Sequence, residues 1–156
     1  MSQNNIFVIN TIDFSQNRNI TIGYEPIRQN RFIVDFPTYF NIPNFAVQKI
    51  TRPNLSFVNN QYIWGNIEME LIDLISPSTS KGVMNMINYC KNLDNKENQN
   101  LFSFFISDLD PTGITVENWI IDVKELVSVN FGESNYGMDE VLKIKITLKP
   151  NRCRIQ

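Results

Sequence analysis

The chain of 156 residues contains no histidine. Histidine is the commonest general base and the commonest metal ligand in proteins, so its absence excludes Ser-His-Asp and Cys-His catalytic arrangements. The two cysteines, Cys90 and Cys153, fall in different predicted elements, and two isolated cysteines without histidine argue against a zinc site. We expect reduced thiols of an intracellular protein: Cys90 as a small buried hydrophobe, and Cys153, between two arginines, as a terminal strand residue or a more reactive thiol.

The sequence also lacks the marks of several other classes of protein. No apolar run approaches the roughly 18 residues that a membrane-spanning helix needs. Residues 1–10 have neither the basic start nor the apolar stretch of a signal peptide. The net charge of -2 leaves no excess of lysine and arginine for gripping nucleic acid. The glycines are scattered singly, which excludes a phosphate-binding loop.

Acidic residues are present, but their spacing favours turns over chemistry. Asp108 and Asp110 precede a proline and lack the closing glutamate of a calcium loop. Glu133, Asp139 and Glu140 flank the last predicted turn, where a solvated hairpin end accounts for them. A carboxylate pair for hydrolysis has no supporting motif, so we expect no catalytic residue, no metal and no cofactor.

The most informative stretch runs from Asn118 to Leu148, where apolar and polar residues alternate. Alternation is typical of a sheet with one apolar and one polar face, because successive side chains of a strand point to opposite sides. One predicted face holds Trp119, Ile121, Val123, Val127, Val129 and Phe131, interrupted only by Glu125; the other holds Ile120, Asp122, Lys124, Leu126, Ser128 and Asn130. A strand of about thirteen residues is more than twice the usual length and outgrows a small core. The pattern therefore predicts a sheet that continues across subunit boundaries.

The remaining sequence predicts shorter strands and one helix in a single β domain of residues 26–156. We expect strands at residues 31–36, 45–51, 66–75 and 101–107, and a helix at 79–92 with one apolar stripe. Residues 52–66 are predicted to be a long loop, residues 94–100 a solvated loop, and residues 1–25 an arm that is either frayed or paired with a neighbour's sheet edge. The expected fold is mainly β (α+β), an antiparallel sandwich or barrel of about six strands with one flanking helix.

This order of elements resembles the contractile-phage tail-tube protein family. The resemblance covers residues 26–155 and includes the aromatic start at Trp119, the long alternating strand, Phe131-Gly132, the acidic turn, the charged and aliphatic last strand, and Tyr62-Ile63-Trp64-Gly65 before a further strand and one helix. Inner-tube proteins of type VI secretion systems and phage tube-initiator proteins share that fold. The resemblance has no sharp motif and does not match residues 1–25.

The resemblance implies a structural virion protein with no enzymatic activity. In the family, six copies form a ring whose long hairpins join into one β-barrel around a channel, and the rings stack into a tube. The implied partners are further copies of the chain, the tail sheath, and baseplate or terminator proteins, with DNA passing through the channel without sequence-specific binding. The implied location is the virion tail, assembled in the host cytoplasm. A tube-initiator or baseplate-junction protein of the same fold remains open, as do a monomeric nucleic-acid-binding barrel and an enzyme with a carboxylate pair.

Two sets of residues are predicted to carry the assembly function. The residues on the polar sides of the long strands are expected to face the channel: Glu68, Glu70, Asp122, Lys124, Ser128, Asn130, Lys143 and Lys145. Their three acidic and three basic side chains cancel, which suits a conduit to which DNA does not stick. The large apolar residues of the loop at 52–66 are expected to contact another subunit or ring, with Trp64 as the anchor: Leu55, Phe57, Tyr62, Ile63 and Trp64.

Overall fold

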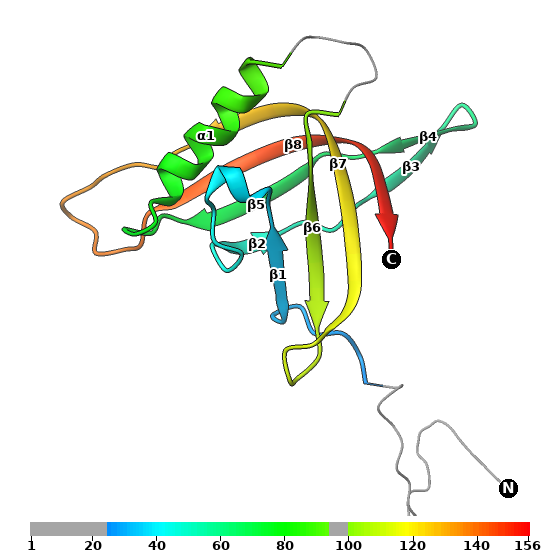
Figure 1. Cartoon of the computed structure of the whole chain (residues 1–156), viewed down its shortest axis with the longest axis horizontal. Helices are drawn as coiled ribbons and strands as arrows, with labels where there is room; N and C mark the ends of the chain where they lie inside the picture. The colour runs from blue at the N-terminus through cyan, green and yellow to red at the C-terminus, as the bar shows by residue number, and fades with distance from the viewer. Residues whose placement is uncertain (1–24, 94–99) are drawn as a thin grey trace, which may run out of the picture.

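The computed structural model describes residues 25–93 and 100–156, and it is mainly β with one helix (Figure 1). The predicted arm at 1–25, apart from its last residue, and nearly all of the predicted loop at 94–100 lie outside the described residues. The strands of the main sheet are β1 (Phe32–Asp35), β2 (Val47–Ile50), β5 (Ile67–Ile72), β6 (Phe102–Leu109), β7 (Thr115–Asn130) and β8 (Lys143–Ile155). The predicted fold class is confirmed.

The main sheet is antiparallel, in the order β1-β6-β7-β8-β5-β2, and it curls until it is nearly closed. The backbone N–H of Val34 in β1 donates to the carbonyl of Asn44, three residues before β2, at 3.1 Å, so the two edges of the sheet approach each other. The apolar sides of the strands line the interior of this barrel-like sheet. Phe104 is fully buried there, with its ring centroid 5.4 Å from that of Phe36 and 6.4 Å from that of Phe102.

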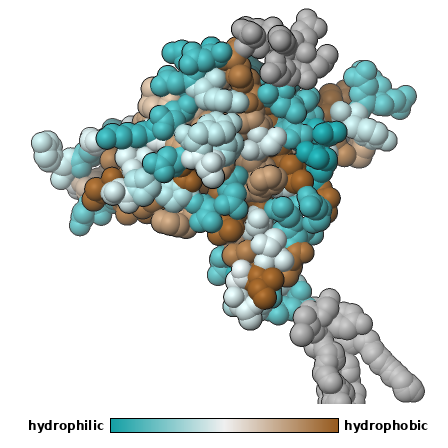
Figure 2. Space-filling view, viewed as in Figure 1, coloured by the Kyte–Doolittle hydropathy of each residue, from teal (hydrophilic) through white to brown (hydrophobic). Residues whose placement is uncertain are grey.

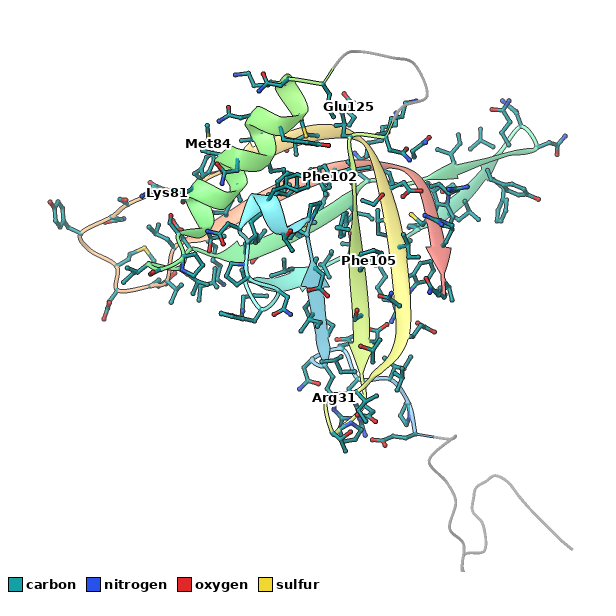
Figure 3. The ribbon with its side chains drawn as sticks, viewed as in Figure 1. Arg31, Lys81, Met84, Phe102, Phe105 and Glu125 are labelled. Atoms are coloured by element: carbon teal, nitrogen blue, oxygen red, sulfur yellow. The ribbon has the colours of Figure 1, made fainter. Side chains whose placement is uncertain are left out.

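The helix α1 (Thr79–Lys91) begins as the sequence predicts and packs beside the short 3-10 helix η2 (Thr38–Phe40). The side chain of Ser78 caps its first turn by accepting a hydrogen bond from the N–H of Lys81. Val83 and Met86 are buried, whereas Lys81 and Met84 lie on the side of the helix away from the sheet (Figure 3). Gly82 permits this approach, because a Cβ there would lie 3.0 Å from the carbonyl oxygen of Phe40.

The long hairpin is longer and less regular than the alternation predicts. β7 has 16 residues and β8 has 13, and β8 continues seven residues beyond the predicted end at Leu148, through Pro150 and Cys153. Three register shifts interrupt the pairing of β7 with β8. The extra residues are Lys124 and Val127 on β7 and Asn151 on β8, and each such β-bulge reverses the inward and outward sense of the residues that follow it.

Candidate assembly surfaces

The two bulges on β7 exchange the faces of Glu125 and Leu126 relative to the prediction. Leu126 pairs with the buried Leu148 and packs against the core, whereas Glu125 pairs with Lys149 and is exposed. The second bulge restores the predicted sense, so Val129 again packs against the core while Ser128 and Asn130 are exposed. Glu125, the one acidic residue within the predicted apolar face, therefore lies outside the core. Phe131, predicted on the same apolar face, is also outside it and remains 37% exposed.

The polar sides of four adjacent strands, β7, β8, β5 and β2, form one continuous surface, which we term the outer face. Cross-strand pairing aligns Asn130, Lys145, Glu70 and Lys49 in one row, and Ser128, Thr147 and Glu68 in the next. Six of the eight residues predicted to face a channel thus share this surface: Glu68, Glu70, Ser128, Asn130, Lys143 and Lys145. A shallow recess of about 280 Å³ lies between Lys49, Glu70 and Lys145.

The remaining two predicted residues lie on β7 outside these aligned rows. Lys124 is the extra residue of a bulge and has no partner in these rows. Asp122 is on the polar side of β7 but only 3% exposed, because Arg152 and Arg154 cover it. Its carboxylate accepts a hydrogen bond from Ser103 and lies 3.3 Å and 3.2 Å from the two guanidinium groups. It therefore holds two arginines in place and presents no charge to open solvent.

The structure also changes the charge of the outer face. A bulge at Gln48 turns Lys49 outward beside Glu70, and the bulges on β7 bring Glu125 beside Lys149. These residues join the six predicted ones, so that Glu68, Glu70 and Glu125 face Lys49, Lys143, Lys145 and Lys149. Among these paired residues, four ammonium groups against three carboxylates leave one positive charge in excess per chain; the exposed Lys124 and the Asp122, Arg152 and Arg154 cluster lie outside this count. These paired rows remain close to neutral across the four strands.

Two stretches of this four-stranded region have an open edge. β7 pairs with β6 only as far as Val123, so among the described residues its stretch from Glu125 to Asn130 pairs with β8 alone. At the other side, β2 pairs with β5 alone among the described residues. Unpaired N–H and C=O groups on a strand edge are a template for another strand. The outer face is thus bordered on both sides by edges that can accept a neighbour.

The predicted loop at 52–66 is a β-hairpin, which the prediction missed. β3 (Leu55–Val58) pairs with β4 (Gln61–Trp64) in a separate two-stranded sheet that projects from the body (Figure 1). Asn59 and Asn60 connect the strands with φ of 50° and 63°, which is the left-handed conformation of both residues in a type I′ turn. The signal was present in the sequence, because asparagine adopts this conformation more readily than most residues.

The hairpin is apolar and exposed. Residues 53–66 contain no charged side chain. Phe57 and Tyr62 are cross-strand partners that are 69% and 73% exposed, with ring centroids 5.0 Å apart. Leu55 and Ile63 are also exposed, but Trp64 is half-buried and packs against the core of its own chain. Phe57 and Tyr62, rather than Trp64, are the aromatic groups available to a partner.

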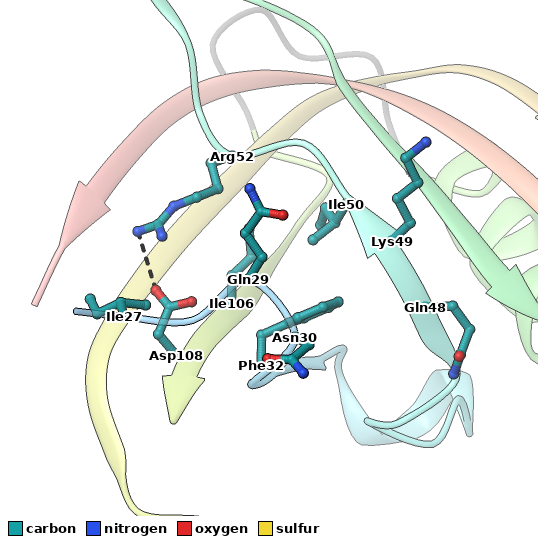
Figure 4. A pocket seen from close by; sticks show the side chains of 10 residues that line it. All are labelled: Ile27, Gln29, Asn30, Phe32, Gln48, Lys49, Ile50, Arg52, Ile106 and Asp108. Atoms are coloured by element: carbon teal, nitrogen blue, oxygen red, sulfur yellow. Dashed lines mark ion pairs between the residues drawn. The ribbon is translucent and has the colours of Figure 1, made fainter. Parts of the chain in front are cut away.

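An arginine fixes the start of the hairpin segment to the main sheet. The guanidinium of Arg52 donates to Glu117 at 2.6 Å, lies 3.2 Å from Oδ2 of Asp108, and stands over the ring of Trp119 at 5.8 Å. Figure 4 shows Arg52 and Asp108 at one side of a cavity of about 560 Å³ between β1 and β2. Among the described residues, Oδ2 of Asp108 accepts no hydrogen bond although it is buried. Its burial raises the pKa of Asp108, and Glu117 beside it adds to the effect while Arg52 opposes it.

We predict that Asp108→Asn gains stability relative to the native chain as the pH rises. Because the pKa is raised in the folded protein, the folded state holds a proton that the unfolded state has lost, and stability declines with pH from the ordinary value of 3.8 up to the raised pKa. The asparagine variant has no carboxyl group to ionise at this position, so it does not lose stability in this way. Urea unfolding should be measured from below pH 3.8 to neutral pH. The free energy of unfolding of the variant minus that of the native chain should increase with pH and then become constant.

Asp110 provides the control of opposite sign. Hydrogen bonds from Thr112 and from backbone N–H groups lower the pKa of Asp110, so its contribution is present above pH 3.8 and lost as the pH falls through the lowered pKa. Asp110→Asn should therefore be less stable than the native chain at neutral pH, with a difference that shrinks in acid. An Asp108→Asn chain that, like Asp110→Asn, becomes less stable than the native chain as the pH rises would contradict the assignment.

The described residues offer little for catalysis or metal binding. Within residues 25–93 and 100–156 no group of three or more histidine, cysteine, aspartate or glutamate side chains is placed to hold a metal ion. Burial, with a contribution from Asp122, raises the pKa of the Cys153 thiol to about 12, so the terminal strand residue and not the reactive thiol is the better description. Burial also raises the pKa of Cys90. In the same part of the chain no helix is long and apolar enough to cross a bilayer.

No protein-family model matches the chain, and no curated protein matches it. Solved structures do match, over nearly the whole chain. A chain of the tube-terminating cap of the anti-feeding prophage is 15% identical, with a TM-score of 0.60, over 89% of this chain and 95% of that chain. A chain of the sheath/tube terminator of the extracellular contractile injection system PVC, in its extended state, is 13% identical, with a TM-score of 0.60, over 85% and 97%. A chain of the PVC sheath-tube complex is 12% identical, with a TM-score of 0.56, over 86% and 93%. The predicted tail-tube fold is confirmed as a fold.

Proposed function

We propose that this chain is a structural subunit of a contractile tail or injection system, and specifically a tube protomer that forms six-membered rings around a channel. The observation that carries the proposal is the four-stranded outer face, which is polar, near neutral in its paired rows and bordered by an open edge on each side. Pairing of the β7 edge at Glu125–Asn130 with the β2 edge of a neighbour would continue the sheet and remove both edges, as closure into a barrel does. The fold shared with tube, terminator and cap components supports the proposal.

In this arrangement the outer face lines the channel and α1 lies on the outside of the ring. One excess positive charge per chain along the paired rows gives little attraction for a phosphate backbone, so DNA would pass without being held. The β3–β4 hairpin extends from the ring and contacts another copy, where its uncharged, aromatic surface is covered. Sheath and baseplate or terminator proteins are the further partners that we propose.

A tube-initiator or baseplate-junction protein is the second candidate, because a chain of the anti-feeding prophage baseplate also has this fold, with 17% identity and a TM-score of 0.57. The two roles predict different assemblies. A tube protomer stacks into rings of many layers, whereas an initiator stops at one ring until tube protein is added. A nucleic-acid-binding monomer would need the concentrated basic surface that the outer face lacks.

We predict that the purified protein forms rings with a central channel, alone or in stacks, with sixfold symmetry in negative-stain images. Light scattering across a concentration series should give a mass that is a multiple of six chains. Seeding with preformed rings should accelerate the growth of stacks if the chain is a tube protomer. A monomer at every concentration, with and without seeds, would overturn the proposal.

A further inference from the structure

The loop between β7 and β8 forms an acidic recess at one end of the molecule. Residues of the segment 131–142, together with Lys143 at the start of β8, line a cavity of about 380 Å³; the lining includes Met138, Val141, Glu133 and Glu140, so two carboxylates stand against one ammonium group. The side chain of Tyr136 is fully exposed, and Met138 and Val141 are more than half exposed. The segment carries Glu133, Asp139 and Glu140 with no basic residue, and none of the three carboxylates forms an ion pair within the described residues.

The opposite end of the molecule presents the β3–β4 hairpin beside two arginines. Figure 1 shows the loop between β7 and β8 at one extreme of the long axis, and the hairpin tip, with the C-terminus nearer to it, towards the other. β4 lies against β8, whose last residues include Arg152 and Arg154. Their side chains are 61% and 45% exposed and share the single buried carboxylate of Asp122, so one positive charge is in excess there. Figure 2 shows apolar surface interleaved with polar surface at both ends.

We propose that the recess of residues 131–142 in one copy receives the β3–β4 hairpin of a second copy. The hairpin supplies a protruding, uncharged, aromatic surface, and the recess supplies apolar groups within an acidic rim. The rim then lies near the exposed guanidinium groups of Arg152 and Arg154, which makes the two ends complementary in charge. This inference rests on the proposed function and deepens it, because it names the surface that receives the hairpin.

The proposed contact joins two different surfaces at opposite ends of the chain. Such a heterologous contact leaves one free hairpin and one free recess on every pair, so association continues instead of stopping at a dimer. The contact is thus suited to adding ring upon ring in one direction. It also accounts for a two-stranded hairpin standing apart from the main sheet, since such a hairpin is marginally stable without a covering partner.

Disulfide trapping between copies tests the contact in the full chain. Gln61→Cys places a thiol on the hairpin and Ser134→Cys places one at the recess, and both positions are exposed. Mixing the two variants under assembly conditions and then oxidising should give a crosslinked dimer in high yield. Lys81→Cys, on the outward side of α1, is the matched control and should crosslink to Gln61→Cys at least tenfold less (~1.4 kcal/mol in effective affinity).

A second measurement uses charge alone. Glu133→Gln with Glu140→Gln removes two rim charges from an exposed loop and should raise the concentration needed for stacking roughly three- to tenfold, with a weaker dependence on salt. Equal crosslinking of Gln61→Cys to the recess and to the α1 control, or unchanged stacking of the glutamine variant, would overturn the recess as the receiving surface. Rings that form normally in those experiments would leave the proposed function standing, whereas absence of any assembly would overturn both.

Discussion

The chain carrying Phe57→Ala and Tyr62→Ala is expected to fold and to form no stacked rings. The two side chains are cross-strand partners on one face of the hairpin, both largely exposed, with no contact that the main core depends on. Buried aromatic residues at the centre of an interface contribute about 2 kcal/mol or more each, so losing both weakens each contact by at least a factor of several hundred. Light scattering should show single rings or free subunits, while circular dichroism and the urea midpoint stay near those of the native chain.

The opposite face of the same hairpin supplies the control. Ser56→Ala with Gln61→Ala alters two residues of the other face, which pair with Ile63 and Val58, without removing an aromatic group. This variant should stack almost as well as the native chain, because small polar side chains at a rim contribute little. Trp64→Ala is not a suitable test of assembly, since Trp64 packs against its own core and its loss would cost stability. Stacking of the Phe57 and Tyr62 variant at native concentrations would mean that the hairpin is not the contact.

The alternation of apolar and polar residues identified the strands, but it did not predict the β-bulges within them. β1, β5, β6, β7, β8 and α1 follow from period and composition, because these patterns report directly which side of an element is buried. The bulges at Gln48, Lys124 and Val127 depend on how two strands fit together over their whole length, which no local pattern encodes. For this reason Lys49 and Glu125 were absent from the predicted surface, and Lys124, although exposed, has no partner in its rows.

The remaining differences come from contacts between residues far apart in the sequence. Asp122 was predicted on the correct side of its strand. Its burial was not predicted, because it depends on two arginines thirty or more positions away in the sequence. Arg52 approaches Asp108 and Glu117 only because the segment before β3 crosses the ends of β6 and β7. The β3–β4 hairpin was not predicted because Asn59 and Asn60 were interpreted as part of a polar loop. In the structure these two asparagines form the tight turn between the strands.

Glu70→Lys is expected to turn the outer face into a surface that holds DNA. Glu70 is the only carboxylate in its row and lies between Lys49 and Lys145 on the adjacent strands. The substitution adds two charge units per chain, about twelve in a ring of six, and places three lysines side by side. Each additional phosphate neutralised steepens the salt dependence of binding by roughly 0.7 for single strands and 0.9 for duplex DNA. Rings of this variant should retain DNA at salt concentrations where native rings release it.

Two further variants separate this effect from general charge and from misfolding. Glu25→Lys makes the same change of charge away from the outer face. Among the described residues the only ion pair of Glu25 is the one with Arg31, and this variant should bind DNA much more weakly than Glu70→Lys. Glu70→Gln removes one charge without placing like charges opposite each other, which would cost a few tenths of a kcal/mol per pair, and it should give an intermediate effect. Equal DNA retention by the Glu25 and Glu70 lysine variants would mean that the outer face does not line the channel. The same conclusion would follow if Glu70→Gln folded but no longer formed rings, because Glu70 would then belong to a contact between subunits.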